Sequence, residues 1–209
     1  MSIEAVNPYP PIIFKDRYSF KDIHKQEAVK ILNLSYHNTH LEKGNAKSSI
    51  GYQTFAPHKN EFFKDFFDWA NLTALEIFKL WNIKGPNDFF IGNSWINCHE
   101  KGGVTVSHNH GFSCLSLIGY ITLPKNAGVT EFKDPHYEFK NLHEYKDENS
   151  GPKEFLPVEV HQGDVVFFPG WLSHRSQISY SNDQRLIISA NFINFTSVSN
   201  FTIQHVYRY

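Results

Sequence analysis

Two histidines separated by a single residue, His108 and His110, are the first residues in this sequence that could carry chemistry. The segment around them, VTVSHNHGFSCL, has the composition of a β-strand. Side chains alternate across a strand, so both imidazoles are expected on the same face, where together they can bind one metal ion. A third ligand would have to come from another strand.

His174 offers such a ligand, because it follows the apolar run Val165-Val166-Phe167-Phe168 and a Pro-Gly turn. Arg185 stands eleven residues further on and opens the run RLIISANFINF, which is also typical of a strand. The candidate residues therefore occur in the order His-x-His, His and Arg, each beside a predicted strand.

The first part of the chain predicts two helices that could support such strands. Apolar residues recur at three- and four-residue spacing over residues 22–36 and, more strongly, over residues 60–83. Gly85-Pro86 is expected to end the second helix, because proline cannot continue it. The polar stretch 37–54 between the helices has the composition of a loop.

After Pro86 the sequence predicts short strands separated by turns such as Lys101-Gly102-Gly103 and Gln162-Gly163-Asp164. The strands are expected at residues 89–97, 104–108, 113–123, 129–132, 156–160, 164–168, 176–180, 185–194 and 201–207. Many short strands after helices predict a mainly β protein, a sandwich or barrel with the helices packed on one outer face. We expect one domain over residues 1–209, with a helical support region (1–86) and a β core (87–209). A polar insert (134–157) is expected to lie as a loop over one mouth of the barrel.

Composition and charge exclude several classes of protein. The formal net charge of −1, without a long run of like charge, does not fit a dedicated nucleic-acid-binding protein. The first residues lack the basic and apolar regions of a secretory signal, and no segment approaches the ~20 apolar residues needed to cross a bilayer. The two cysteines, Cys98 and Cys114, form no CxxC pair, so we expect a soluble, cytoplasmic protein with free thiols. Nothing in the sequence specifies an oligomeric state.

Common catalytic and cofactor signatures are also absent from the sequence. The glycine-rich signatures of dinucleotide- and phosphate-binding loops do not occur, and no serine lies in a convincing nucleophile elbow. A structural zinc site usually has four Cys or His ligands, whereas only three candidates cluster here. Imidazole ligands that leave open positions on a ferrous ion fit this set of residues.

An ordered set of short motifs surrounds these residues. It comprises Trp95-Ile96-Asn97, Gly102 or Gly103, His108-x-His110, Leu115-Ser116 with Tyr120, Gly163-Asp164 with Phe168-Pro169, His174, and Arg185 with Ser189-x-Asn191. Together these motifs resemble the iron- and 2-oxoglutarate-dependent dioxygenase superfamily, and within it a bacterial and phage subgroup with a His-x-His motif. The resemblance covers residues 95–195, about half of the chain.

The resemblance implies a double-stranded β-helix, the jelly-roll core shared with cupins, with the N-terminal helices on its outside. It implies Fe(II), 2-oxoglutarate and O2 as cofactor and cosubstrates, and a hydroxylase that releases succinate and CO2. The substrate would be a peptidyl side chain or a small metabolite. The implied metal ligands and catalytic residues are His108, His110 and His174. Arg185 would bind the far carboxylate of 2-oxoglutarate, and further contacts to the cosubstrate would come from Tyr120, Ser189 and Asn97.

His110 departs from the usual pattern, because most members of the superfamily carry Asp or Glu at this position. A site of three histidines is the first interpretation. Alternatively, His110 lies outside the ligand set and Glu131 or Asp134 completes it, or the third position is vacant, as in halogenases of the same superfamily.

Structural interpretations stand beside the functional ones. The histidines could be ordinary strand or turn residues, and Arg185 could form an ion pair with Asp164 or Asp183. Tyr120, Asn97 and Ser189 could serve packing alone. The other histidines of this half, His99, His136, His143 and His161, are expected in loops or at the surface, where His99 and His136 could line the entrance. Two further functions remain open: a cupin-like metalloenzyme that does not use 2-oxoglutarate, and a non-catalytic binding module on the same barrel.

Overall fold

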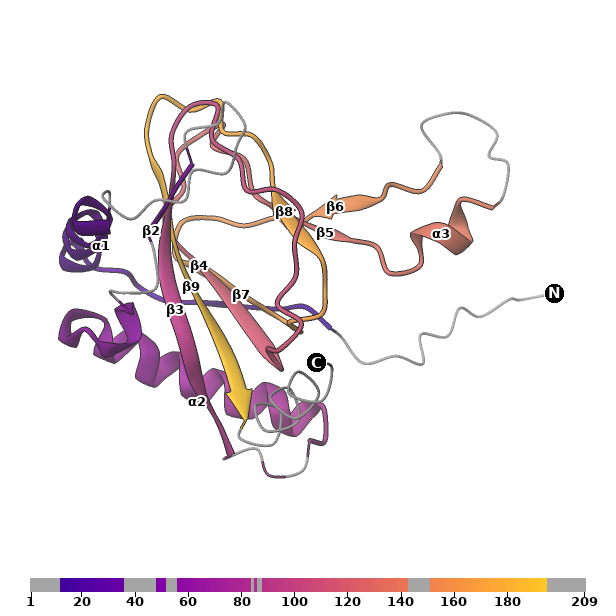
Figure 1. The fold of residues 1–209 in the computed structure, drawn as a ribbon, viewed down its shortest axis with the longest axis horizontal. Helices are drawn as coiled ribbons and strands as arrows, with labels where there is room; N and C mark the ends of the chain where they lie inside the picture. Colours follow the sequence, from indigo (N-terminus) through magenta and orange to yellow (C-terminus); the bar gives the residue numbers. More distant parts are fainter. Residues whose placement is uncertain are drawn as a thin grey trace, which may run out of the picture.

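A computed structural model describes residues 12–35, 48–51, 56–83, 85, 88–142 and 151–194, whose strands form two antiparallel sheets (Figure 1). The major sheet has the strand order β1-β7-β4-β9-β3-β2, and the minor sheet has the order β6-β5-β8. The strands are β1 (Phe14–Arg17), β2 (Ser48–Gly51), β3 (Phe89–His99), β4 (Leu115–Thr122), β5 (Thr130–Lys133), β6 (Phe155–Pro157), β7 (Asp164–Phe168), β8 (His174–Ser176) and β9 (Arg185–Asn194). The helices are α1 (Asp22–Ser35), α2 (Lys64–Leu80) and α3 (Tyr137–Lys140), with 3-10 turns at Pro57–Lys59 and Glu61–Phe63.

The two faces of the major sheet have different partners. One face carries Leu117, Phe167 and Ile188, which join buried residues of α1 and α2 in one apolar cluster. The opposite face carries Ile118 and Ile187, which pack against Phe132 of the minor sheet. This alternation confirms the prediction of a mainly β protein with helices on the outside, and it leaves the space between the sheets for the candidate residues.

Helix α2 supports the sheet through one apolar stripe, as its spacing predicted. Its buried residues are Phe66, Phe67, Ala70, Ala74, Ile77 and Phe78. The helix is shorter than the predicted range 60–83. The side chain of Asn60 accepts a hydrogen bond from the backbone N–H of Phe62, so the chain enters through a 3-10 turn. After the helix the chain turns at Asn82, whose backbone is left-handed with a φ of 53°. The helix therefore ends before Gly85.

Strand bounds agree with the prediction at β7 and β9 and differ elsewhere. Residues 104–108 form no strand; only His108 pairs there, in an isolated bridge with His174. Strand β8 begins at His174 rather than at residue 176, and residues 177–180 follow it without strand pairing. Strand β2 occupies part of the stretch predicted to be a loop, where Ser48 pairs with His99. The predicted strand 201–207 lies outside the described residues.

The described part of the polar insert does not cover the barrel. Helix α3 lies beyond the ends of β5 and β6, on the side away from the major sheet (Figure 1). Residues 143–150 of this insert are outside the described part of the chain. Among the described residues, no helix is long and apolar enough to cross a membrane.

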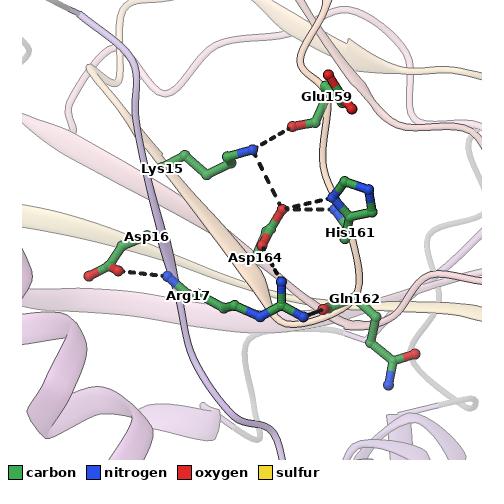
Figure 2. A network of polar contacts seen from close by, with 7 residues as sticks. All are labelled: Lys15, Asp16, Arg17, Glu159, His161, Gln162 and Asp164. Carbon is green, nitrogen blue, oxygen red and sulfur yellow. Dashed lines mark hydrogen bonds and ion pairs between the residues drawn. The ribbon is translucent and has the colours of Figure 1, made fainter.

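Strand β1 is attached to β7 by a polar cluster around the buried carboxylate of Asp164 (Figure 2). Lys15 Nζ and Arg17 Nη1 of β1 each lie 3.7 Å from an oxygen of Asp164. The backbone N–H of His161 donates to the same carboxylate at 2.8 Å. The intervening turn needs Gly163, whose φ is 92°. Asp164 therefore fixes both the edge strand and the turn that leads into β7.

Candidate active site

Three histidines converge between the sheets: His108 from the irregular segment before β4, His110 two residues later, and His174 at the start of β8. Each offers one ligand atom, and these atoms lie within 4.8 Å of one another. The ring centroids are 4.4 Å apart for His108 and His174, and 5.1 Å apart for the other two pairs. The predicted strand context for His108 and His110 was wrong. Backbone hydrogen bonds between His108 and His174, of 3.0 and 2.9 Å, hold the segment extended without a regular strand.

A glycine permits the close approach that brings His110 into this group. The backbone N–H of His110 donates to the carbonyl of Gly170 at 2.7 Å. A Cβ atom at position 170 would lie 2.3 Å from the carbonyl oxygen of Ser113 and 2.5 Å from that of His110. The turn before His174 and the loop after His110 can therefore touch only because residue 170 has no side chain.

Oxygen acceptors set the tautomer of the histidines. Nδ1 of His108 lies 2.8 Å from the carbonyl oxygen of Val106, and Nδ1 of His174 lies 3.0 Å from that of Leu172. A carbonyl oxygen only accepts hydrogen bonds, so Nδ1 carries the proton and Nε2 keeps its lone pair. This is the arrangement in which a histidine is ready to bind a metal ion.

His110 is oriented by a side chain rather than by the backbone. Its Nδ1 lies 2.7 Å from Oδ1 of Asn191, which also accepts a hydrogen bond from Ser116 Oγ at 2.8 Å. An oxygen that accepts from Ser116 can accept from His110 as well, so the proton of His110 is again on Nδ1.

Burial keeps two of these imidazoles neutral. Burial, together with the neighbouring His108, lowers the pKa of His174 to about 3 and that of His110 to about 4. Neutral imidazole is the form that binds a metal ion. At neutral pH the group is therefore in its ligating state without having to release protons from these two residues.

Neither carboxylate considered as an alternative ligand belongs to this group. Glu131 accepts from Arg175 Nε at 2.8 Å and from Gln177 Nε2 at 3.0 Å. Asp134 pairs with Lys140 and accepts from the backbone N–H of His136 at 2.9 Å. Among the described residues, the group that could hold a metal ion consists of the three histidines alone.

Arg185 is buried between the sheets, with 1% of its surface exposed. Its Nη1 and Nη2 atoms have no hydrogen-bond partner within the described chain, and the Oδ1 atom of Asn97 is in the same condition. Burial lowers the pKa of Arg185 to about 10, so the side chain is still charged at neutral pH. It forms no ion pair with Asp164, which is engaged by Lys15 and Arg17. A buried cation with free donors fits an anionic group of a cosubstrate.

A narrow cavity of about 30 Å³ connects the histidines to other predicted residues. Its lining comprises Trp95, Asn97, Thr105, His108, His110, Ile118, Thr130, His174, Arg175, Ser176, Ile187 and Ser189. Tyr120 lies behind it, since its hydroxyl donates to Thr130 Oγ1 at 2.8 Å and accepts from the Thr130 N–H at 3.1 Å. A larger open groove of about 700 Å³, on the outer side of β8, shares only Arg175 and Ser176 with this cavity.

His99 is not the surface or loop residue that the sequence suggested. It is 1% exposed, ends β3 and faces Arg185 in the register of β3 and β9. Trp95, Asn97 and His99 alternate along β3, so a longer strand prediction would have placed all three on one face. His136 and His161 have mostly exposed side chains, as expected, and His143 lies outside the described residues.

Comparisons with known proteins agree with this geometry. Residues 93–191, a little less than half of the chain, match the family model described as "Putative 2OG-Fe(II) oxygenase". A search of curated proteins found no match. The chain is similar to the crystal structure of the non-heme alpha ketoglutarate dependent carbocyclase SnoK from nogalamycin biosynthesis, with 13% identity and a TM-score of 0.60 over 88% of this chain and 79% of that one.

Two further structures show the same fold. A Pseudomonas putida prolyl-4-hydroxylase has 14% identity and a TM-score of 0.57, over 88% of this chain and 92% of that one. The epimerase SnoN, in complex with Fe3+, alpha ketoglutarate and nogalamycin RO, has 12% identity and a TM-score of 0.55, over 88% of this chain and 79% of that one. The predicted double-stranded β-helix is confirmed by these structures. The family match and the three clustered histidines support Fe(II) and 2-oxoglutarate as cofactor and cosubstrate. Residues 93–191 therefore resemble the Fe(II)- and 2-oxoglutarate-dependent oxygenases in sequence, and the chain has the fold of solved members of that superfamily.

Proposed function

We propose that this oxygenase hydroxylates an unactivated C–H bond of a peptide side chain or a small metabolite, with release of succinate and CO2. One observation carries the proposal. The same barrel contains three imidazoles whose Nε2 lone pairs are free and a buried guanidinium whose terminal nitrogens have no partner among the described residues. A metal ion would satisfy the imidazoles, and a carboxylate of the cosubstrate would satisfy the guanidinium.

The histidines and Arg185 bind different partners in this proposal. His108, His110 and His174 would hold Fe(II) through Nε2. Arg185 holds the distal carboxylate of 2-oxoglutarate in a charge-assisted pair. Iron and 2-oxoglutarate, when bound, supply the oxidising chemistry, in which one atom of O2 enters succinate and the other enters the product.

Other residues would orient the cosubstrate. Asn97 and Ser189 line the cavity, and the unpartnered Oδ1 of Asn97 is available to accept a hydrogen bond. Tyr120 is proposed to act through Thr130, whose side chain it holds at the cavity wall. The open volume is about 30 Å³, so the lining side chains must move apart to admit a molecule as large as 2-oxoglutarate.

A peptide is the substrate we favour. The segments that carry the histidines also expose three large apolar side chains: Val106 (53% exposed), Phe112 (47%) and Trp171 (54%). Such a rim suits a chain that lies across the entrance while one side chain reaches the metal. The similarity to a prolyl-4-hydroxylase supports the same class, whereas the similarity to SnoK and SnoN supports a small metabolite.

Anaerobic titration of 2-oxoglutarate into the Fe(II)-loaded protein tests the proposal. Bidentate 2-oxoglutarate on ferrous iron gives a visible charge-transfer band, which wild type should show. His174→Ala should abolish the band, and Arg185→Ala should shift the titration to higher 2-oxoglutarate concentration. Bound iron without a band would indicate a metalloenzyme that does not use 2-oxoglutarate. Absence of iron binding would indicate a binding module.

A further inference from the structure

The guanidinium of Arg185 has one polar side-chain partner among the described residues, and that partner is not a carboxylate. Its Nε atom lies 3.4 Å from Nδ1 of His99, and both side chains are almost fully buried. The charged and titratable groups that act on Arg185 are otherwise Tyr120 and Cys98, and both are neutral at ordinary pH. A buried arginine is usually neutralised by an acid, so this pairing calls for an explanation.

Hydrogen-bond chemistry fixes the state of His99. Arginine only donates, so Nδ1 of His99 must be the unprotonated acceptor and Nε2 must carry the proton. Nε2 lies 2.8 Å from Oγ1 of Thr105 and therefore donates to it. Burial, reinforced by the charge of Arg185, lowers the pKa of His99 to about 3. The imidazole is thus a neutral acceptor with one possible tautomer.

Thr105 is itself anchored to the strand that carries a proposed metal ligand. Its backbone N–H donates to Ser176 Oγ at 2.8 Å, and its carbonyl accepts from the Ser176 N–H at 3.0 Å. Ser176 lies two residues after His174 in β8. A continuous chain of contacts therefore runs from Arg185 through His99 and Thr105 to the strand of His174.

We propose that His99 is a positioning residue for cosubstrate binding: it occupies Nε of Arg185, so that Nη1 and Nη2 face the distal carboxylate of 2-oxoglutarate. This inference rests on the proposed function. A neutral imidazole orients the guanidinium without cancelling its charge. A carboxylate at position 99 would compete with the cosubstrate for the same donors.

Calorimetric titration of 2-oxoglutarate into the full-length, Co(II)-loaded protein under anaerobic conditions tests the role of His99 without turnover. The variants are His99→Leu, His99→Asn and His99→Gln. Leu removes both contacts of the imidazole. The Asn oxygen can take the place of Nδ1 and accept from Arg185, whereas the Gln amide can take the place of Nε2 and reach only Thr105. The Asn and Gln variants are matched in polarity and differ in which contact they keep.

The Kd for 2-oxoglutarate should rise about tenfold to a hundredfold in His99→Leu and His99→Gln, and should return close to the wild-type value in His99→Asn. Pyruvate has the 2-oxo group and the near carboxylate but lacks the distal carboxylate, so it should bind all four proteins equally. Co(II) affinity should also be equal. If His99→Leu does not fold, the comparison of Asn with Gln carries the test.

Two results would overturn the role of His99 alone. One is equal 2-oxoglutarate affinity in wild type and the variants. The other is a loss of pyruvate affinity as large as the loss for 2-oxoglutarate, which would indicate general damage to the barrel. Wild type that binds Co(II) but not 2-oxoglutarate would instead overturn the proposed function, and this inference with it.

Discussion

Nδ1 of His110 lies 2.7 Å from Oδ1 of Asn191, and this contact joins the His-x-His motif to β9. The other two histidines are oriented by backbone carbonyls, which no substitution can remove. His110 alone depends on a side chain for its tautomer. A substitution at Asn191 should therefore lower the affinity for the metal ion while all three histidines are retained.

Asn191→Ala should lower the affinity for Fe(II) or Co(II) about tenfold to a hundredfold. The Nδ1 proton of His110 loses its nearer acceptor and keeps only Ser116 Oγ, at 3.2 Å. Asn191→Asp keeps an acceptor oxygen at the same position and should bind the metal at least as tightly as wild type. Direct metal titration, with each variant's unfolding midpoint measured alongside, separates this effect from loss of fold. Equal metal affinity in Asn191→Ala and wild type would show that the contact does not orient the ligand.

Gly170→Ala should disturb the site from the backbone. The added Cβ would meet two carbonyl oxygens at 2.3 and 2.5 Å, so the turn before His174 and the loop of His110 must separate. We expect weaker metal binding and a loss of about 1–3 kcal/mol in unfolding free energy. Urea denaturation and metal titration measure the two effects.

Gly111→Ala is the matched control for that substitution. It adds the same methyl group to the neighbouring loop, where the nearest atom, Oδ1 of Asn109, is 3.6 Å away. Metal affinity and stability should stay close to wild type. Similar losses in both variants would mean that loop flexibility, rather than close approach at Gly170, governs the site.

Metal-free protein should lose stability as the pH falls below about 6.5. Burial lowers the pKa values of His99 and His174 to about 3, whereas these residues titrate near 6.5 in the unfolded chain. Between these values the unfolded state binds more protons than the folded state. The unfolding free energy therefore falls with decreasing pH, by on the order of 1 kcal/mol per pH unit for each imidazole. Above pH 6.5 the neutral imidazoles make their full contribution to stability.

Urea unfolding at several pH values checks this, with His99→Leu and His161→Gln compared. His99→Leu should reduce the slope of unfolding free energy against pH, whatever its effect on stability at neutral pH. His161→Gln, at a mostly exposed histidine, serves as the comparison for the loss of an imidazole at the surface. An unchanged slope in His99→Leu would show that the buried imidazole is not the group that titrates.

The parts of the fold that sequence reasoning placed correctly are those governed by local pattern. The strand 164–168 contains the apolar run 165–168 and starts after a glycine with positive φ. The long, mostly apolar segment 185–194 becomes strand β9. The segment 104–108 has a similar composition, yet it lacks a partner strand and pairs only at His108. That single bridge joins it to a distant part of the chain, which the local pattern does not reveal.

The sequence likewise predicted some residues of the site and missed others. The order of His108, His110, His174 and Arg185 along the chain is visible in the sequence, and the structure brings the histidines together. His99 was misplaced because a histidine near the end of a strand reads as a surface residue. Its burial depends on Arg185, its cross-strand partner in another part of the chain. Contacts between distant polar residues depend on which strands lie side by side, and the local pattern of one strand does not identify its partner strand.

The identity of the third ligand can be decided by substituting each candidate in turn. His110→Ala should greatly weaken metal binding, whereas Glu131→Gln and Asp134→Asn should leave it unchanged. The reason is geometric: Glu131 is engaged by Arg175 and Gln177, and its neighbour in the sequence, Phe132, takes the inward position opposite His174. Fe(II) titration of the three variants measures this directly. Loss of metal in Glu131→Gln or Asp134→Asn, with His110→Ala unaffected, would place a carboxylate in the ligand set and make His110 a neighbour of the site rather than a ligand.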